Sequence, residues 1–417
     1  MKVLWITNIV FPEANTLMGN QLGFKETGGW MLGAARSLIS NSEIELTVAS
    51  LSNETQQLLH LKGEKIKYYV IPKGRGNHLY NRDYEGYWKQ INNEYHPDVI
   101  HIHGTEYTHG LAYINACGAD NVVVSIQGMK SAISNYYFYG LSFKDIVCNF
   151  TPHDWMTGGV FRQKKICVKT GQFEIELLSK VKHVIGRTSW DRARTWAINP
   201  TAKYYFCNET LREEFYSGRK WLYDNCKKHS IFVSQAAYPI KGLHQLLKAL
   251  PMVLSHYPDT IVRIAGKDIR GWNGWKDYIH YGGYGKYLSR LINKYKINKS
   301  VEFVGKLDAE GMLNEYLNCN LFICPSSIEN SPNSLGEAQI LGTPCLASYV
   351  GGIPDMMKGN ESCLYRFEEV EMLAYKICSI FDEKGNVGNE LVEIAKERHS
   401  RVRNANELFA IYKVIQG

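Results

Sequence analysis

The order of apolar segments constrains the fold of this chain more than any other feature of its sequence. Short apolar runs alternate with longer segments whose apolar residues recur every three to four positions, a pattern typical of strands and amphipathic helices in turn. Such alternation predicts βαβ units with parallel strands. The first set of expected strands comprises Lys2–Thr7, Ile44–Ala49, Lys67–Ile71, Val99–His103, Val122–Ile126, His183–Gly186 and Tyr204–Cys207.

The alternation starts again after a polar stretch between about Cys207 and Lys228. A chain of 417 residues, 45% of them hydrophobic, holds enough apolar material for two cores, and one sheet of a dozen strands would be unusual. We therefore expect two doubly wound sheets, whose ligands bind at the carboxyl ends of the strands. The second set of expected strands comprises Ile231–Ser234, Thr260–Ala265, Val301–Val304, Leu321–Cys324 and Cys345–Ser348.

Composition excludes several classes of protein. The 48 Lys and Arg against 41 Asp and Glu give a net charge of +7, which suits an anionic small molecule or membrane surface and is too weak for nucleic acid. No apolar run reaches the roughly 18 residues that a spanning helix needs. Ten cysteines without a CxxC pair indicate reduced thiols and a cytosolic protein. His101 and His103 share one strand face, but no third ligand lies at a suitable spacing, so we expect no metal.

The segment Pro325–Glu337 carries the strongest chemical signal. It leaves an apolar strand and enters a helix whose first amides, at Asn333–Leu335, form an anion site. Its carboxylates, Glu329 and Glu337, would repel a phosphate and therefore suit hydrogen bonds to hydroxyl groups. Together these features suit a sugar nucleotide. The alternative is an ordinary N-cap at Ser331 or Asn333, with Glu337 complementing the helix dipole.

Two further turns carry candidate phosphate-binding residues. Lys241 precedes Gly242 at a strand-to-helix turn, where it can offset the charge that develops on a leaving diphosphate. Gly28 and Gly29 let the backbone approach a pyrophosphate at the start of a helix. The glycine pattern is neither GxGxxG nor GxxxxGK[ST], so it supports neither an NAD site nor a P-loop. A solvated lysine and a flexible loop are the alternatives.

Taken together, these motifs resemble glycosyltransferase family 4. The resemblance rests on Pro325–Glu337, Gly342–Pro344, Gly351–Gly352, Pro97–Gly104 and Val301–Leu307, along with the two turns above, and covers essentially the whole chain. It implies the α/β GT-B fold: two Rossmann-like, doubly wound parallel-sheet domains facing a cleft, with a C-terminal helix crossing back to the first. The expected domains are 1–207 for the acceptor, 208–395 for the nucleotide sugar, and 396–417 for that helix.

The resemblance also implies roles for the donor-binding residues. Glu329 would contact the donor sugar near its reacting face, and Lys241 would bind the phosphate; these two are the expected catalytic residues. Glu337 would hold the ribose hydroxyls. The backbone at Asn333, Ser334 and Leu335 would cradle the diphosphate, Gly28 and Gly29 would close over the donor, and Gln235 stands where many members carry Arg.

The acceptor side is expected to contain three residues that follow strands of the first sheet. Gln127 stands where many family members carry His; it cannot act as a general base, but it can hydrogen-bond a hydroxyl group. We expect His103 to be a hydrogen-bonding group of the cleft. Arg187 would either bind acceptor or diphosphate, or form a structural salt bridge.

An aromatic run, Tyr136–Tyr139, precedes a basic cluster that comprises Arg162, Lys164, Lys165 and Lys169. These residues could seat a lipid-diphosphate acceptor at a membrane surface, or they could form a core-packing helix followed by a solvated basic face.

The function implied by the resemblance is retaining, metal-independent transfer of a hexose from a UDP- or GDP-sugar to a glycan or lipid-linked saccharide, in surface polysaccharide biosynthesis. No cofactor is expected besides the nucleotide-sugar substrate. The expected partners are that donor, the saccharide acceptor and a peripheral membrane contact, without nucleic acid, in the cytoplasm or at the inner face of the membrane. A GT-B nucleotide-sugar epimerase stays open as an alternative. So does a non-catalytic sugar-nucleotide-binding protein, which Gln235 and Gln127 would suit.

Overall fold

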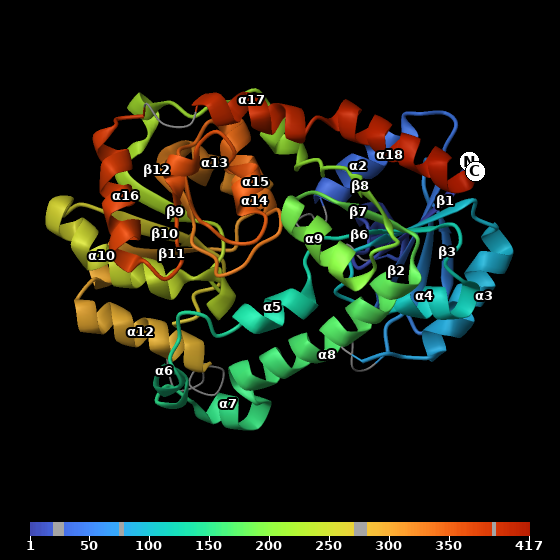
Figure 1. The fold of residues 1–417 in the computed structure, drawn as a ribbon, viewed down its shortest axis with the longest axis horizontal. Helices are drawn as coiled ribbons and strands as arrows, with labels where there is room; N and C mark the ends of the chain where they lie inside the picture. The colour runs from blue at the N-terminus through green and yellow to red at the C-terminus, as the bar shows by residue number, and fades with distance from the viewer. Residues whose placement is uncertain (20–28, 75–78, 271–281, 386–388) are drawn as a thin grey trace. The chain divides into compact units, whose positions relative to one another are not determined.

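The structure, a computed structural model, describes residues 1–19, 29–74, 79–270, 282–385 and 389–417 of the chain (Figure 1). These residues form two compact units, each assembled from separate stretches of sequence. Unit 1 comprises Met1–Ser134, Ile166–Glu213 and Glu397–Gly417, and unit 2 comprises Asn135–Lys165 and Glu214–Lys396.

Unit 1 contains an eight-stranded sheet in the order β3-β4-β2-β1-β5-β6-β7-β8 within the described residues. All neighbouring strands are parallel except β3, which runs antiparallel to β4. The strands are β1 (Lys2–Thr7), β2 (Glu45–Ser52), β3 (Leu59–Lys62), β4 (Lys67–Pro72), β5 (Val99–His103), β6 (Val122–Ser125), β7 (His183–Gly186) and β8 (Lys203–Phe206).

The strands at the centre of this sheet are apolar on both faces because helices cover both. Successive residues of a strand point to opposite faces, so Leu4 and Ile6 join one hydrophobic cluster, whereas Val3 and Trp5 join the other. The first cluster includes residues of α3 (Asp83–Tyr95), α4 (His109–Cys117) and α8 (Gly159–Lys180). The second includes residues of α2 (Gly29–Ile39) and α18 (Arg401–Gln416), which pack together along the sheet (Figure 1). The other helices of this unit are α1 (Pro12–Leu17) and α9 (Ser189–Ile198).

Unit 2 contains a six-stranded parallel sheet in the order β11-β10-β9-β12-β13-β14 within the described residues. Rings of Phe232, Tyr316 and Phe322 pack edge to face in its core, with centroids 5.2 Å apart for both pairs that include Tyr316. The strands are β9 (Lys227–Val233), β10 (Ile261–Ala265), β11 (Val301–Gly305), β12 (Cys319–Cys324), β13 (Cys345–Ser348) and β14 (Leu364–Tyr365). The main helices are α10 (Leu243–His256), α12 (Gly283–Tyr295), α13 (Ala309–Asn318), α14 (Asn333–Leu341), α15 (Ile353–Met356), α16 (Val370–Asp382) and α17 (Asn389–Arg398).

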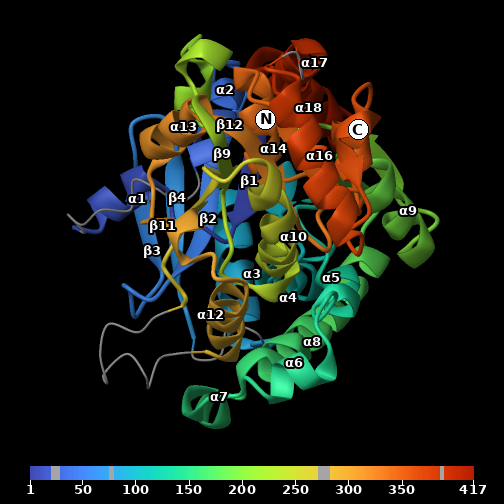
Figure 2. The same ribbon diagram turned by 90° about the vertical axis from the view of Figure 1, so that its left-hand side faces the viewer.

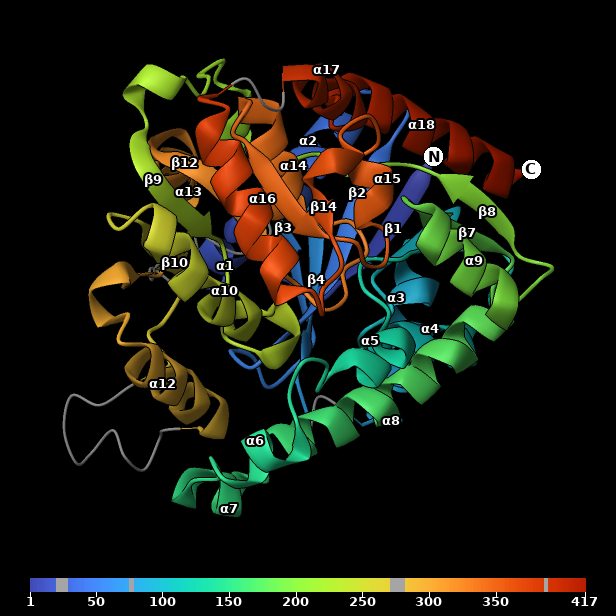
Figure 3. The same ribbon diagram turned by 60° about the vertical axis from the view of Figure 1, so that its left-hand side comes forward.

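A helical segment that follows the first six strands in sequence also belongs to unit 2. It begins at the end of α5 (Lys130–Tyr136), continues through α6 (Phe143–Val147) and α7 (Pro152–Thr157), and ends in the first residues of α8. α6, α7 and the start of α8 lie side by side, with α6 packed against α12 (Figures 2 and 3). Both short helices are closed by capping boxes, in which Ser142 and Thr151 exchange hydrogen bonds with Asp145 and Asp154, respectively.

Every strand expected from the sequence is present. β1, β5, β7 and β13 have the expected bounds, and the ends of the others are shifted by a few residues. The sequence did not predict β3 or β14: β3 alternates half-buried and exposed residues, and β14 is only two residues long. Most of the segment 396–417, which was expected to be one helix, forms α18, while its first three residues end α17 and His399 and Ser400 separate the two helices. Across the described residues no helix combines the length and the apolar character needed to cross a membrane.

Candidate functional site

Lys241 and Glu329, which the sequence predicted as catalytic residues, form an ion pair in unit 2. The Nζ atom of Lys241 donates a hydrogen bond to Oε1 of Glu329 at 2.6 Å, and the same oxygen accepts a hydrogen bond from the Ser326 hydroxyl at 2.8 Å. Both residues follow strands of the sheet: Lys241 ends the 3-10 turn Pro239–Lys241 after β9, and Glu329 lies in the loop after β12. β9 and β12 are adjacent, so their carboxyl ends bring the two loops together.

Two glycines hold the loop that carries Glu329. Gly242 has φ +71°, and a Cβ atom there would lie 1.7 Å from the carbonyl oxygen of Pro325. Gly351 has φ +53°, and its Cβ atom would lie 1.8 Å from the carbonyl oxygen of Glu329 itself. Only glycine permits these approaches. The glycines of the Lys241-Gly242 and Gly351-Gly352 motifs therefore support the position of the Glu329 backbone from two sides.

The side chains of this ion pair are mostly buried, with exposed fractions of 24% for Lys241 and 15% for Glu329. Burial alone would lower the pKa of Lys241, but the negative charge of Glu329 and the hydrogen bond to it outweigh burial and raise that pKa above its usual value. The lysine is therefore a cation at neutral pH. It occupies the turn where the sequence predicted a phosphate-binding lysine.

The predicted diphosphate loop forms the first turn of α14. The N-cap residue is Pro332, which makes no side-chain capping bond within the described residues, and Asn333, Ser334 and Leu335 follow it. The Leu335 N–H donates to the carbonyl oxygen of Pro332 at 3.0 Å, and an anion at this helix start would face the positive end of the helix dipole. Glu337 lies further along α14, is 4% exposed, and accepts a hydrogen bond from the Tyr316 hydroxyl at 3.3 Å. Gln235, in the loop after β9, is exposed.

The unit 1 candidates lie at the carboxyl ends of its own strands. His103, at the end of β5, is buried and stacks on His101 with ring centroids 3.7 Å apart, so the two rings share one face of the strand as expected. Burial, together with the nearby charge of Arg187, lowers the pKa of His103 to about 3, so the ring is neutral. Its Nε2 atom has no hydrogen-bond partner among the described residues.

A buried hydrogen-bond chain, which the sequence did not indicate, runs beside His103. The Trp5 indole N–H donates to the Tyr412 hydroxyl at 2.9 Å, and His101 lies 2.6 Å from that hydroxyl and 2.6 Å from the Ser125 hydroxyl. Because the indole can only donate, the Tyr412 hydroxyl is able to donate to Nδ1 of His101, which leaves Nε2–H of that ring to donate to Ser125. The Ser125 proton is then directed away from the histidine.

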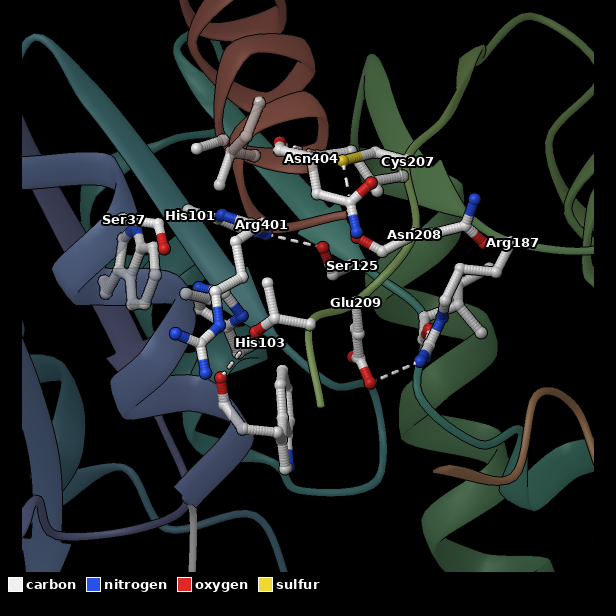
Figure 4. Close-up of a pocket in the computed structure, with 18 residues that line it drawn as sticks. Ser37, His101, His103, Ser125, Arg187, Cys207, Asn208, Glu209, Arg401 and Asn404 are labelled. Atoms are coloured by element: carbon white, nitrogen blue, oxygen red, sulfur yellow. Dashed lines mark hydrogen bonds and ion pairs between the residues drawn. The ribbon is translucent and has the colours of Figure 1, made fainter. Parts of the chain in front are cut away.

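Trp5, His101, His103 and Ser125 line a pocket of unit 1 whose empty space, including the part open to solvent, is about 530 Å³ (Figure 4). His101 and His103 lie toward one end, and Arg187 and Glu209 toward the other. Trp5 and Trp30 add aromatic walls to the lining, and the start of α18 closes another side. The pocket therefore combines neutral imidazoles and a buried ion pair with apolar surface, a composition typical of small-molecule sites.

Arg187 has partners within unit 1. Its guanidinium forms an ion pair with Glu209 at 2.6 Å, with side chains 5% and 14% exposed, and also donates to the carbonyl oxygen of Ile126. Its backbone N–H donates to Asp191 at 3.0 Å. This geometry corresponds to the structural salt bridge that the sequence left open, while contact with acceptor or diphosphate stays a prediction.

Gln127, which follows β6, lies beside the carboxylate of Glu106 in the turn after β5. A Cβ atom on Gly104 (φ +93°) would lie 2.6 Å from Oε2 of Glu106 and 3.3 Å from Oε1 of Gln127, so both side chains lie over this glycine. Oε1 of Glu106 accepts the Gly128 N–H at 2.7 Å, and burial raises the pKa of this carboxyl above its usual value.

The glycine pair of the first domain is only partly described. Gly29 is the first residue of α2, and a Cβ atom there would lie 3.3 Å from the side chain of Arg212; Gly28 falls outside the described residues. No group of three or more His, Cys, Asp or Glu side chains is placed to hold a metal ion in the part of the chain that the structure describes. That the chain needs no metal stays a prediction.

Comparison with known proteins finds a family match in the second half of the chain. Residues 219–400 match the family model described as glycosyl transferases group 1, so this part of the chain carries a glycosyltransferase domain, which includes Lys241, Glu329 and Glu337. A "GDP-mannose-dependent monoacylated alpha-(1-6)-phosphatidylinositol monomannoside mannosyltransferase" from Corynebacterium glutamicum is 26% identical over 152 residues, 35% of this chain and 36% of its own length. The chain spans about a third to a half of the length of the curated relatives it matches.

Solved structures extend the likeness to the whole fold. Sucrose-phosphate synthase from Thermosynechococcus elongatus has a TM-score of 0.70 at 15% identity, over 99% of this chain and 98% of its own. A structure described as trehalose-6-phosphate from E. coli bound with UDP-2-fluoro glucose has a TM-score of 0.65 at 12% identity, over 99% of both chains. These likenesses confirm the predicted GT-B fold, in which two α/β units each contain a mostly parallel sheet. Membership of family 4 stays a prediction.

Proposed function

We propose that this protein is a retaining glycosyltransferase that moves a hexose from a UDP- or GDP-sugar to a glycan or lipid-linked saccharide, as in surface polysaccharide biosynthesis. The observation that carries the proposal is the Lys241–Glu329 ion pair at the adjacent ends of β9 and β12, within the segment that matches glycosyl transferases group 1. A cation and a carboxylate held together suit a donor that presents both phosphate oxygens and sugar hydroxyls.

In the proposed reaction Lys241 stabilises the negative charge that develops on the leaving diphosphate. The first-turn amides of α14, from Asn333 to Leu335, bind the diphosphate oxygens, and Glu337 accepts hydrogen bonds from the ribose hydroxyls. Glu329 holds the donor sugar and favours its oxocarbenium-like transition state through its negative charge. The acceptor hydroxyl attacks the anomeric carbon from the face that the diphosphate leaves, so the configuration is retained. The bond from that carbon to the diphosphate oxygen breaks as the glycosidic bond forms, and the hydroxyl proton passes to the leaving diphosphate.

The acceptor is proposed to contact unit 1 residues. His103 and Gln127 offer hydrogen bonds to saccharide hydroxyls, and the neutral state of His103 suits an uncharged partner. Gly28 and Gly29 are proposed to close over the donor, and Gln235 replaces a cation that would otherwise share the phosphate charge. We further propose that the enzyme works in the cytoplasm, in peripheral contact with the inner face of the membrane.

The direct test is the variant Glu329→Gln, which keeps the shape of the side chain and removes its charge. Donor turnover, measured as nucleotide diphosphate released with and without saccharide acceptors, should fall at least about a hundredfold, the scale expected when one electrostatic contact to a transition state is lost. The matched control is Glu315→Gln. Glu315 has the same 15% exposed fraction and pairs with Arg263 at 2.7 Å in the same unit, yet the proposed mechanism does not use it. Equal turnover of the two variants would refute the proposed role of Glu329.

The donor is identified by a thermal-shift screen of nucleotide diphosphates and their sugars. A ligand at about 100 times its Kd stabilises the protein by roughly 2.7 kcal/mol, which is readily detected. Retention is tested by the anomeric configuration of the product. An altered free sugar nucleotide formed without acceptor would instead indicate an epimerase, and tight donor binding without hydrolysis or transfer would indicate a non-catalytic binding protein.

A further inference from the structure

Large apolar side chains are exposed on one segment of unit 2. Trp155 and Met156 on α7 are 80% and 68% exposed, and Phe143 on α6 is 74% exposed. Val147 on α6 and Phe161 at the start of α8 are also exposed, at 46% and 38%. We call the solvent-facing side of residues 142–165 the α6–α8 surface. Such a concentration of exposed apolar side chains marks a contact site.

Aromatic contacts connect this surface into one structure. Trp155 packs edge to face on Phe150 with centroids 5.4 Å apart, Phe150 lies 6.0 Å from Phe161, and Phe161 packs on Phe138 at 5.5 Å. Phe150 also lines an apolar pocket with Tyr284 of α12. The segment is therefore anchored to the body of unit 2, while Trp155 remains outside. α7 lies at the outer edge of the unit in each view (Figures 1–3).

The exposed charges of the same surface are positive. Lys144, Arg162 and Lys165 are exposed, and no ion pair to them is found within the described residues. Lys164 lies over the ring of Phe138, 4.7 Å from its centroid. Cations are thus interleaved with aromatic rings.

The two carboxylates of the segment do not neutralise these cations. Asp145 accepts hydrogen bonds from the backbone and hydroxyl of Ser142, and Asp154, which is buried, accepts from Thr151 and from the backbone N–H of Gly283 at 2.8 Å. Both cap helices, and Asp154 also contacts α12. The four cations of residues 142–165, Lys144, Arg162, Lys164 and Lys165, outnumber these two carboxylates, so the α6–α8 surface has a net positive charge.

We infer that the α6–α8 surface docks on an anionic lipid bilayer. An interfacial element needs aromatic and aliphatic side chains that enter the headgroup region and cations that meet anionic lipids, and this surface presents both. A second copy of this chain is a poor occupant, because the surface would face its own positive charge in a chain of net charge +7. The inference rests on the proposed peripheral membrane contact and assigns it to specific residues.

Vesicle sedimentation tests the inference without donor or acceptor, so its outcome does not depend on transfer. The full-length protein is mixed with vesicles of phosphatidylcholine alone, or of equal parts phosphatidylcholine and phosphatidylserine. We expect binding to the anionic vesicles that weakens as salt is raised, and at least about tenfold weaker binding to phosphatidylcholine. Equal binding to both vesicle types, or to neither, would overturn the inference.

Matched variants assign the binding to this surface. Trp155→Ser and the charge reversal Lys165→Glu should each weaken partitioning, and the two together should do so at least about tenfold. Trp196→Ser is the control for the first, because Trp196 is 68% exposed on α9 of unit 1, and Lys299→Glu is the control for the second. The four side chains are exposed, so unchanged melting temperatures are expected. If Trp155→Ser and Trp196→Ser bind anionic vesicles equally well, the α6–α8 surface is not the docking site. The proposed function is judged separately: it stands if Trp155→Ser still transfers sugar to a soluble acceptor.

Discussion

The ion pair between Lys241 and Glu329 makes a quantitative prediction about stability in the absence of any ligand. At 2.6 Å, and with the effective dielectric constant of about 20 that suits protein sites, two unit charges attract by about 6 kcal/mol. Desolvation of both groups offsets most of this attraction. Since both side chains retain some exposure, we expect a net coupling of about 1–3 kcal/mol.

The perturbation is a double-mutant cycle of Lys241→Met, Glu329→Gln and the combined variant, with unfolding followed in urea. Lys241→Met leaves a largely buried carboxylate whose remaining hydrogen-bond donor, within the described residues, is the Ser326 hydroxyl. This variant should therefore lower the free energy of unfolding by about 1–3 kcal/mol. Adding Glu329→Gln to it should restore most of that loss, because the isolated charge is removed. A double variant whose loss equals the sum of the two single losses would refute the pairing.

Three further predictions concern stability. Gly242→Ala should lower the free energy of unfolding by more than about 3 kcal/mol, and by more than the control Gly305→Ala does. Both glycines have positive φ (+71° and +82°), but only the Cβ atom at position 242 would meet a backbone carbonyl. Similar urea midpoints for the two variants would contradict this prediction. Tyr412→Phe should lower the free energy of unfolding by about 1–3 kcal/mol, because it leaves the buried Trp5 indole and His101 ring without a hydrogen-bond partner. Tyr365→Phe should be nearly neutral, since that buried hydroxyl has no partner in the described residues. Equal melting temperatures of the two variants would refute this prediction. The pKa of His103 is about 3 in the folded protein and about 6.5 in the unfolded chain, so the unfolded chain takes up the proton first as pH falls below about 6.5, and this ring lowers the free energy of unfolding by about 2 kcal/mol at pH 5. His103→Gln should therefore flatten the dependence of that free energy on pH, measured by urea unfolding. An unchanged slope would contradict the assignment.

The sequence predicted those parts of the fold that depend on local periodicity. Parallel strands buried on both faces read as continuous apolar runs, which is why β1 and β5 were predicted with their observed bounds. The positions of Lys241 and Glu329 after strands were also predictable, because a loop that follows a strand is visible in the sequence. Their separation of 2.6 Å was not, because it depends on the order of β9 and β12 in the sheet.

Features that depend on long-range packing left no local signal. Nothing in residues 135–165 indicates which of the two cores they join, since short amphipathic helices can cover either. The exposure of Trp155 and Phe143 was equally hidden, because an aromatic side chain in a helix is ordinarily buried. A structural salt bridge of Arg187 was one of the two alternatives from the sequence, but its partner Glu209 was not foreseen, because no spacing rule connects residues on different loops.

The hydrogen bond between Trp5 and Tyr412 joins residues 407 positions apart and therefore has a consequence for synthesis. A ribosome completes all strands of the first sheet when it has made about half of the chain, but Tyr412, which lies against Trp5 and His101, is translated only after the whole of unit 2. The part of the nascent sheet that α18 covers must therefore remain exposed while roughly 200 residues are added, which takes about ten seconds or more at about 5–20 residues per second. During that interval the buried indole and imidazole of this sheet are exposed to chaperones and to other nascent chains.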